Sequence, residues 1–386
     1  MIPKTADDLA VLTRLRRELH ARPALSNAEG ETAGRIDEFM AGSGPDRVVR
    51  GLGGHGLAAV FEGTVPGPSV LLRAELDALP IDEVGGPPWS TTNPGVSHRC
   101  GHDGHMAILA GIALRLGRVR PARGRAVLLF QPAEETGEGA RRVVEDAAFA
   151  ELEGDWCFAL HNLPGWPRGE VLLREGTFAA GSIGLVAALV GETSHAAYPE
   201  EGRSPALAMA RLIEEMTRLP ERIGAFEGLA LATVIHARLG EIAFGTTPGY
   251  AEVMATLRAD REEVLERLKA AVPDLLPQVA GPAGLEQRLS WADEFPVTVN
   301  HAEAVRAVRS AAAGADLTVS ELSEPMRWSE DFGWFTGRAR GALFGLGTGR
   351  DHPPLHGRDY DFPDDLIAPG VEVMHGIVRD LLGETA

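Results

Sequence analysis

Apolar runs alternate with helix-like stretches through the first half of the chain. Three runs, at residues 69–76, 124–132 and 155–162, are rich in Val, Leu, Phe and Ala and end in polar residues. The stretches between them, at 104–118 and 136–154, repeat apolar residues at the spacing of one helix face. This alternation of strand and helix predicts βαβ units, in which helices pack against a sheet.

The pattern changes at about residue 182. Two strand-like segments with a half-exposed face lie at 182–191 and 248–259. They alternate with two helical stretches at 204–219 and 261–276. Two strands and two helices within such a length predict a compact α+β domain.

Helical and strand-like segments of the first kind return after residue 292. They include an apolar run at 341–349 and end in a helical stretch at 364–383. We therefore predict an α/β protein whose first domain is discontinuous, residues 1–181 and 292–386, with helices flanking a mixed sheet. Residues 182–291 are predicted to form a second, inserted α+β domain.

Composition and charge indicate a globular protein and exclude several partners. The 386 residues are 44% hydrophobic and 24% charged, with a formal net charge of −18. Such an acidic chain is a poor partner for nucleic acid or for an anionic membrane. The apolar runs are too short to span a bilayer, and the N-terminal segment lacks the apolar core of a signal peptide. Since Cys100 and Cys157 are the only cysteines, we expect reduced thiols and a cytoplasmic location.

Ionisable residues follow each strand-like run of the first domain. Ligands and catalytic groups of α/β proteins gather at the carboxyl ends of the strands, so these side chains are expected along one edge of the sheet. They are Glu75, Asp77, Glu134, Glu135, His161, Asp351, His352 and His356.

The segment SHRCGHDGHMAI adds a thiol and imidazoles at the start of a helix. Cys100 and His102 are two residues apart in an extended segment and can point to one side, and Asp103 is a candidate helix N-cap. Thiolate, imidazole and carboxylate groups are the ligands of a transition-metal site. Because Glu134 and Glu135 are adjacent, we expect one to be a ligand and the other the base for a metal-activated water.

Two other functions, dinucleotide binding and catalysis by a cysteine nucleophile, fit the sequence less well. Gly51–Gly56 matches the glycine pattern of dinucleotide-binding proteins, but a short strand interrupted by Gly63 and Pro66 follows it, where that fingerprint needs a helix. Cys100 could instead be a nucleophile activated by a histidine. That mechanism gives no role to the glutamates and later histidines, and a chelator would separate the two hypotheses.

Several segments, in this order along the chain, are together similar to one family. They are RRELHARPALSNAEGET, LLRAELDALPIDE, HRCGHDGHMAILAG, LLFQPAEETGEGA, ALHNLPGWPRGEV, GETSHAAYPEEGRSPALAMA, SEDFGWF and HPPLHGRDYDFPDDL. In them the chain resembles the metallopeptidase-type amidohydrolases, which include hippurate hydrolase, aminoacylase-like enzymes and the plant auxin-conjugate hydrolases. The resemblance covers nearly the whole chain, and the order and spacing of the segments carry it.

The resemblance implies a site for two divalent metal ions. Cys100 would bridge the ions, and Glu134 would be the general base. Asp77 would orient an imidazole that binds a metal. The remaining ligands divide between the ions, His102 and His161 on one and Glu135 and His356 on the other.

The resemblance also gives the inserted domain a role as a lid and dimerisation domain. His195 matches the family's lid histidine, which donates to the substrate from the partner subunit, so a homodimer through residues 182–291 is implied. The chain departs from the family at Gly245, where an asparagine usually lines the substrate pocket.

The resulting prediction is hydrolysis of the amide bond of N-acyl amino acids or related small amides. The ligand set favours zinc or manganese and admits cobalt or nickel. One alternative is a metallo-dipeptidase or carboxypeptidase of the same fold. A second, from a different class, is a catalytically silent metal- or peptide-binding protein.

Overall fold

The computed structural model describes residues 6–385 and divides into two compact units. The first unit contains described residues 6–178, 298–325 and 331–385, and the second contains 179–297 and 326–330. The sequence-based boundaries at 181/182 and 291/292 fall inside strands β8 (Gly181–Val190) and β11 (Glu286–Phe295). The short return at 326–330 was not anticipated, because no change of pattern marks it.

The first unit is built on a mixed eight-stranded sheet, which confirms the predicted α/β class. The strand order is β1-β2-β4-β3-β5-β14-β6-β13. The central pairs β4/β3, β3/β5 and β5/β14 are parallel, and β1 and β2 add an antiparallel edge. The strands are β1 (Arg47–Leu52), β2 (Gly56–Glu62), β3 (Val65–Glu75), β4 (Arg123–Gln131), β5 (Trp156–Pro164), β6 (Val171–Leu173), β13 (Val319–Glu321) and β14 (Arg340–Gly349). The short strands β7 (Gly176–Ala179) and β12 (Thr298–Asn300) form a separate pair.

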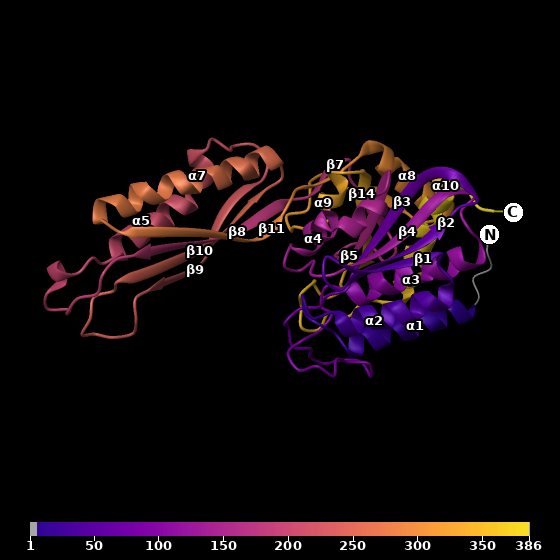
Figure 1. Ribbon diagram of the computed structural model, residues 1–386, viewed down its shortest axis with the longest axis horizontal. Coiled ribbons are helices and arrows are strands. Elements are labelled where there is room, and N and C mark those ends of the chain that lie inside the picture. The colour runs from indigo at the N-terminus through magenta and orange to yellow at the C-terminus, as the bar shows by residue number, and fades with distance from the viewer. Residues whose placement is uncertain (1–5, 386) are drawn as a thin grey trace. The chain divides into compact units, whose positions relative to one another are not determined.

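Helix α3 (His102–Arg118) is the buried centre of the helical layers. It packs against β3 and against helices α1, α2 and α10 (Figure 1). Glycines allow these close approaches, since a Cβ at Gly104 would lie 2.3 Å from the ring of Phe362 and one at Gly111 would lie 2.5 Å from Val371. The first-unit helices are α1 (Ala6–Ala21), α2 (Gly30–Ser43), α3, α4 (Gly139–Glu145), α8 (Ala302–Gly314), α9 (Gly333–Thr336) and α10 (Ile367–Leu382), with 3₁₀ turns η1 (Ala147–Glu151) and η4 (Asp364–Leu366).

The glycine-rich stretch Gly51–Gly56 is the turn of the β1–β2 hairpin. Gly53 has a φ of 59°, and a Cβ there would lie 2.9 Å from Val143. Strand β2 follows the turn directly. The tight turn of this hairpin therefore accounts for the glycines.

The second unit is a four-stranded antiparallel sheet with helices packed on it (Figure 1). Its order is β11-β8-β10-β9, where β9 is Ala230–Leu239 and β10 is Tyr250–Ala259. The prediction of two strands was wrong, because β9 and β11 are edge strands that lack the alternation of buried and exposed residues seen in β10. The helices are α5 (Ala206–Thr217), α6 (Leu219–Arg222) and α7 (Glu262–Ala280), with 3₁₀ turns η2 (Pro199–Glu201) and η3 (Gly281–Ala283).

Among residues 6–385, no helix combines the length and the apolar character that crossing a membrane requires.

Candidate metal and active site

The carboxyl ends of β3, β4, β5 and β14 converge with the start of α3, as expected for ligands in an α/β sheet. Three overlapping groups of side chains there offer ligand atoms within 4.8 Å of one another. The groups are Cys100, His102 and His161; Cys100, Glu135 and His356; and His102, Glu134 and Glu135. Asp77 lies against the first of them. The structure thus brings together the predicted ligands, Glu134 and Asp77 of the first unit, whereas His352 Nε2 lies 2.9 Å from the carbonyl oxygen of Asp361 instead.

The two buried imidazoles are oriented by main-chain carbonyl groups. His102 Nδ1 lies 2.9 Å from the carbonyl oxygen of Asp77, and His161 Nδ1 lies 3.0 Å from that of Asn162. A carbonyl oxygen only accepts, so each Nδ1 donates, and in the neutral imidazole each Nε2 keeps its lone pair. His161 Nε2 faces Cys100 Sγ at 3.5 Å. This is the tautomer and the orientation that a metal ligand requires.

His102 Nε2 supplies the test of whether a cation fits this site. The atom is buried and has no hydrogen-bond partner. It lies 3.8 Å from Glu134 Oε2 and 3.8 Å from Glu135 Oε1. A lone pair facing two carboxylates at this distance is repulsive unless a positive charge lies between them. The donor set of thiol, imidazoles and carboxylates therefore fits a divalent cation.

Electrostatics across the site point the same way. Burial alone would lower the pKa of His102, but Glu75, Asp77 and Glu135 raise it to about 10. Burial and the charges of Glu135 and Glu134 raise the pKa of the Cys100 thiol well above its usual value. Negative charge in a buried space contributes to both shifts, and a bound cation would offset that charge.

The second group is completed from a loop that follows β14. His356 Nε2 lies 3.8 Å from Glu135 Oε2, so Glu135 faces both His102 and His356. The His356 backbone has a φ of 64°, a left-handed conformation that is uncommon for a non-glycine residue. Cys100 belongs to both the His161 group and the His356 group.

Asp77 contacts two of the candidate ligand segments with its carboxylate. Its Oδ2 accepts from Ser26 Oγ at 2.7 Å and from the Glu135 backbone N–H at 2.9 Å, and its Oδ1 lies 3.6 Å from His102 Nδ1. Burial would raise the pKa of Asp77, but His102 and these donors lower it. Asp77 thus touches the segments of both His102 and Glu135.

Two residues of the SHRCGHDGHMAI segment have roles other than those of ligands. The helix N-cap is Gly101, so the assignment of Asp103 as the cap was wrong. Asp103 is fully buried and pairs with Arg16 and His20, and burial favours such pairing over capping. His105 Nδ1 lies 2.7 Å from Glu75 Oε2, and its ring makes an edge-on contact with the ring of His161 at a centroid distance of 5.1 Å.

Sequence reasoning missed Asn162 and Tyr360. Asn162 Nδ2 donates to the carbonyl of Cys100 at 3.0 Å and lies 2.6 Å from the Tyr360 hydroxyl. A Cβ at Gly101 would lie 2.4 Å from Asn162 Oδ1, so the glycine is required for this approach. The position of Asn162 directly after His161 was the one available signal.

His195 belongs to the second unit, where it is exposed on a loop. The backbone N–H of Ala196 donates to the carbonyl of Gly245 at 3.0 Å, and His195 forms an isolated bridge with Thr246. The predicted lid histidine and the glycine that replaces the family's asparagine are therefore neighbours within this unit.

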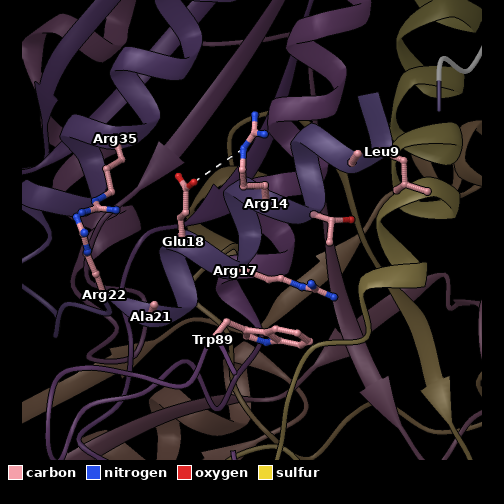
Figure 2. A pocket seen from close by; sticks show the side chains of 10 residues that line it. Leu9, Arg14, Arg17, Glu18, Ala21, Arg22, Arg35 and Trp89 are labelled. Carbon is pink, nitrogen blue, oxygen red and sulfur yellow. Dashed lines mark ion pairs between the residues drawn. The ribbon is translucent and has the colours of Figure 1, made fainter. Parts of the chain in front are cut away.

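A groove of about 1040 Å³ lies apart from the ligand cluster, on the surface of α1. Figure 2 shows Arg17 extending over the indole of Trp89, with its guanidinium carbon 3.5 Å from the ring centroid. Arg14, Arg22 and Arg35 also line it, but Glu18 and Glu31 lie within 4 Å of them. The groove contains none of the candidate ligands.

The fold and the cluster together define an α/β protein with a candidate metal site at one edge of its sheet. The model of Peptidase family M20/M25/M40 matches residues 71–380. N-acetyl-L-cysteine deacetylase of Bacillus subtilis is 33% identical over 351 residues, 89% of this chain and 82% of that protein. N-acetyldiaminopimelate deacetylase of Lactiplantibacillus plantarum is 32% identical over 309 residues, 78% of each chain. The chain belongs to peptidase family M20/M25/M40 and is a hydrolase, which confirms the resemblance found in the sequence.

Solved structures show the same fold along the whole chain. A putative aminohydrolase from methicillin-resistant Staphylococcus aureus superposes with a TM-score of 0.87 at 24% identity, covering 97% of both chains. A Bacillus subtilis protein described as a dinuclear metal binding peptidase of the M20 family superposes with a TM-score of 0.82 at 23% identity, covering 98% of this chain and 99% of that one.

Proposed function

We propose that this hydrolase cleaves the amide bond of N-acyl amino acids with the help of two divalent metal ions. The observation that carries the proposal is the position of His102 Nε2, which faces Glu134 and Glu135 at 3.8 Å each. The relatives named as deacetylases of N-acetylated amino acids support the substrate class.

The residues that would hold the ions divide into two sets around Cys100. His102 and His161 would hold one ion and Glu135 and His356 the other, and Cys100, which belongs to both groups, would contribute its thiolate to each. Zinc or manganese suits this donor set best, and cobalt or nickel would also bind. When bound, the ions supply Lewis acidity, which polarises the amide carbonyl and makes a water molecule acidic.

Glu134 then carries the proton. Its side chain is buried, with Oε2 3.8 Å from His102 Nε2, and it lies outside the two ligand sets proposed above. It takes a proton from the attacking water as the new C–O bond forms, and it delivers that proton to the amine nitrogen as the C–N bond breaks. The products are a carboxylate and the free amine of the amino acid.

The second unit would serve as a lid and as the surface of a homodimer. His195 would donate to the oxyanion that develops on the substrate carbonyl, from the partner subunit. Large apolar side chains exposed on this unit, at Ile235, Ile242 and Phe244, support an interface there. A cytoplasmic location stays a prediction from the sequence.

The test combines metal analysis with a substrate panel. We expect two ions per chain, activity on N-acetyl amino acids that a chelator abolishes and added metal restores, and at least tenfold lower kcat/KM on free dipeptides. Higher kcat/KM on dipeptides would instead assign the metallo-dipeptidase alternative. Metal binding without hydrolysis of any member of either panel would assign the silent binding protein and overturn the proposal.

A further inference from the structure

The loop that carries His356 must be held in place by something other than its own secondary structure. Between β14 and η4 the chain contains no helix or strand, and the His356 side chain is 51% exposed. Yet His356 Nε2 has to face Glu135, from a backbone with a φ of 64°. A strained residue on an irregular loop persists only where surrounding contacts over-determine it.

Two buried arginines make those contacts. Arg99 is the residue before Cys100, and it donates to the Tyr360 carbonyl through its guanidinium while its own carbonyl accepts from the His356 N–H at 2.8 Å. Its charge is matched by Glu83, 2.7 Å away. Arg99 therefore ties the Cys100 segment to the His356 loop by two separate bonds.

Arg16 makes the second connection, from helix α1. Its side chain is fully buried, with Nε 2.8 Å from Asp103 Oδ2, Nη2 in contact with Asp361 and Nη1 3.4 Å from Asp364. Asp103 directly follows the ligand His102, and Asp361 lies on the His356 loop. One guanidinium thus joins the segment of one proposed ion to the segment of the other.

The charges show that this cluster is a closed ionic clamp and not a further cation site. Although His20, Asp103 and Asp361 offer a possible metal-binding triplet, the guanidinium of Arg16 already supplies the positive charge there. His20 Nδ1 adds a contact of 2.8 Å to Asp103. Burial would raise the pKa of Asp103, but Arg16 and His20 hold it far below its usual range.

We propose that Arg16 and Arg99 are positioning residues that set His356 against Glu135, so that the ion held by these two ligands depends on the clamp. The ion held by His102 and His161 does not, since those imidazoles are fixed by the carbonyls of Asp77 and Asn162. This gives the N-terminal RRELH segment a function that the proposed chemistry leaves unassigned. The inference rests on the proposed two-ion site.

The neighbouring Arg17 provides a matched control. It bonds Asp364 through Nε at 2.9 Å and Nη2 at 2.7 Å and lies over Trp89, on the outer face of α1 (Figure 2). Arg17 forms no hydrogen bond or ion pair with Asp103 or Asp361. Arg17→Gln therefore removes an arginine from the same helix while leaving the bridge between the two ligand segments in place.

The experiment is a cobalt(II) titration of the metal-free full-length protein, followed by visible absorption and calorimetry. We expect two equivalents for the wild type and for Arg17→Gln. Arg16→Gln and Arg99→Gln should keep one equivalent at wild-type affinity and bind the second at least tenfold more weakly, and His356→Ala should behave in the same way. Arg16→Lys should not rescue the second equivalent, because an ammonium cannot span three carboxylates as a planar guanidinium does.

Asp361→Asn keeps the proposal testable if the arginine variants do not fold. It alters a partly exposed loop residue, leaves the Arg16–Asp103 pair intact and should weaken the same equivalent. Two equivalents at wild-type affinity in folded Arg16→Gln or Asp361→Asn, or equal weakening of both, would overturn the clamp. A wild type that binds a single equivalent would instead refute the two-ion site.

Discussion

Asp77 contacts the imidazole of His102 twice. Its carbonyl oxygen lies 2.9 Å from His102 Nδ1, and its carboxylate Oδ1 lies 3.6 Å from the same atom. The same carboxylate accepts from the backbone N–H of Glu135 at 2.9 Å. Asp77 therefore sets the tautomer of one proposed ligand and the backbone of another. Such outer contacts orient the ligands of a metal ion and tune its affinity.

Asp77→Asn should weaken metal binding without removing a ligand. The amide keeps the size of the side chain but loses the negative charge that supports the His102 imidazole, so we expect a loss of about 10- to 100-fold in metal affinity. Competition with a chromophoric chelator measures this loss. Ser26→Ala, which removes one donor to Asp77, should have a smaller effect. An unchanged affinity in Asp77→Asn would mean that the carbonyl alone orients His102.

Glu134→Gln should separate catalysis from metal binding. Glutamine cannot shuttle the proton, so kcat should fall by about 10²- to 10⁴-fold, while the metal content stays at the wild-type value. Glu135→Gln is the matched comparison, because it should lose metal as well as activity. The assignment of the base fails if metal-loaded Glu134→Gln turns over N-acetyl amino acids at the wild-type rate.

His195→Ala should lower kcat and leave the metal content unchanged, since His195 lies in the second unit and outside the candidate ligand groups. If His195 acts on the partner's substrate, co-refolding His195→Ala with Glu134→Gln should restore activity. A mixed dimer then has one site with both defects and one with neither. Recovery absent from verified mixed dimers would place His195 in the site of its own chain.

Local pattern predicted the parts of the fold whose signal lies within one segment. The runs at β3, β4 and β5 are buried on both faces and therefore form continuous apolar stretches in the sequence. The ends of these stretches predicted the position of the polar cluster. Strand β9 was not predicted, because it is an edge strand whose residues 235–239 are all exposed. A strand without a buried face carries no alternation to read.

The clamp could not be predicted because its partners are far apart in sequence. Arg16 and Asp361 are separated by 345 positions, and Arg99 and Tyr360 by 261. From the sequence alone, an arginine on an amphipathic helix is expected to be exposed to solvent, because arginine is rarely buried unless it is paired. The motif RRELH was visible in the sequence, but only the fold shows that its first arginine is buried and its second lies at the surface.

His375 couples folding to pH at a site remote from the ligands. It lies on α10, and burial together with Arg115 and Arg379 lowers its pKa to about 4 from a usual value of 6.5. Between these values the unfolded chain binds a proton that the folded chain does not. The contribution is therefore complete above pH 6.5 and is lost as the pH falls toward 4, at a cost of up to about 3 kcal/mol.

His375→Gln should remove this part of the acid sensitivity, because glutamine does not titrate. We expect the free energy of unfolding from urea denaturation of the metal-free protein to fall less steeply between pH 6.5 and 4 in the variant than in the wild type. His55→Gln, at an exposed position, controls for the loss of an imidazole and should keep the wild-type slope. Parallel pH profiles for wild type and His375→Gln would show that His375 is protonated equally in both states, against the burial that the structure gives it.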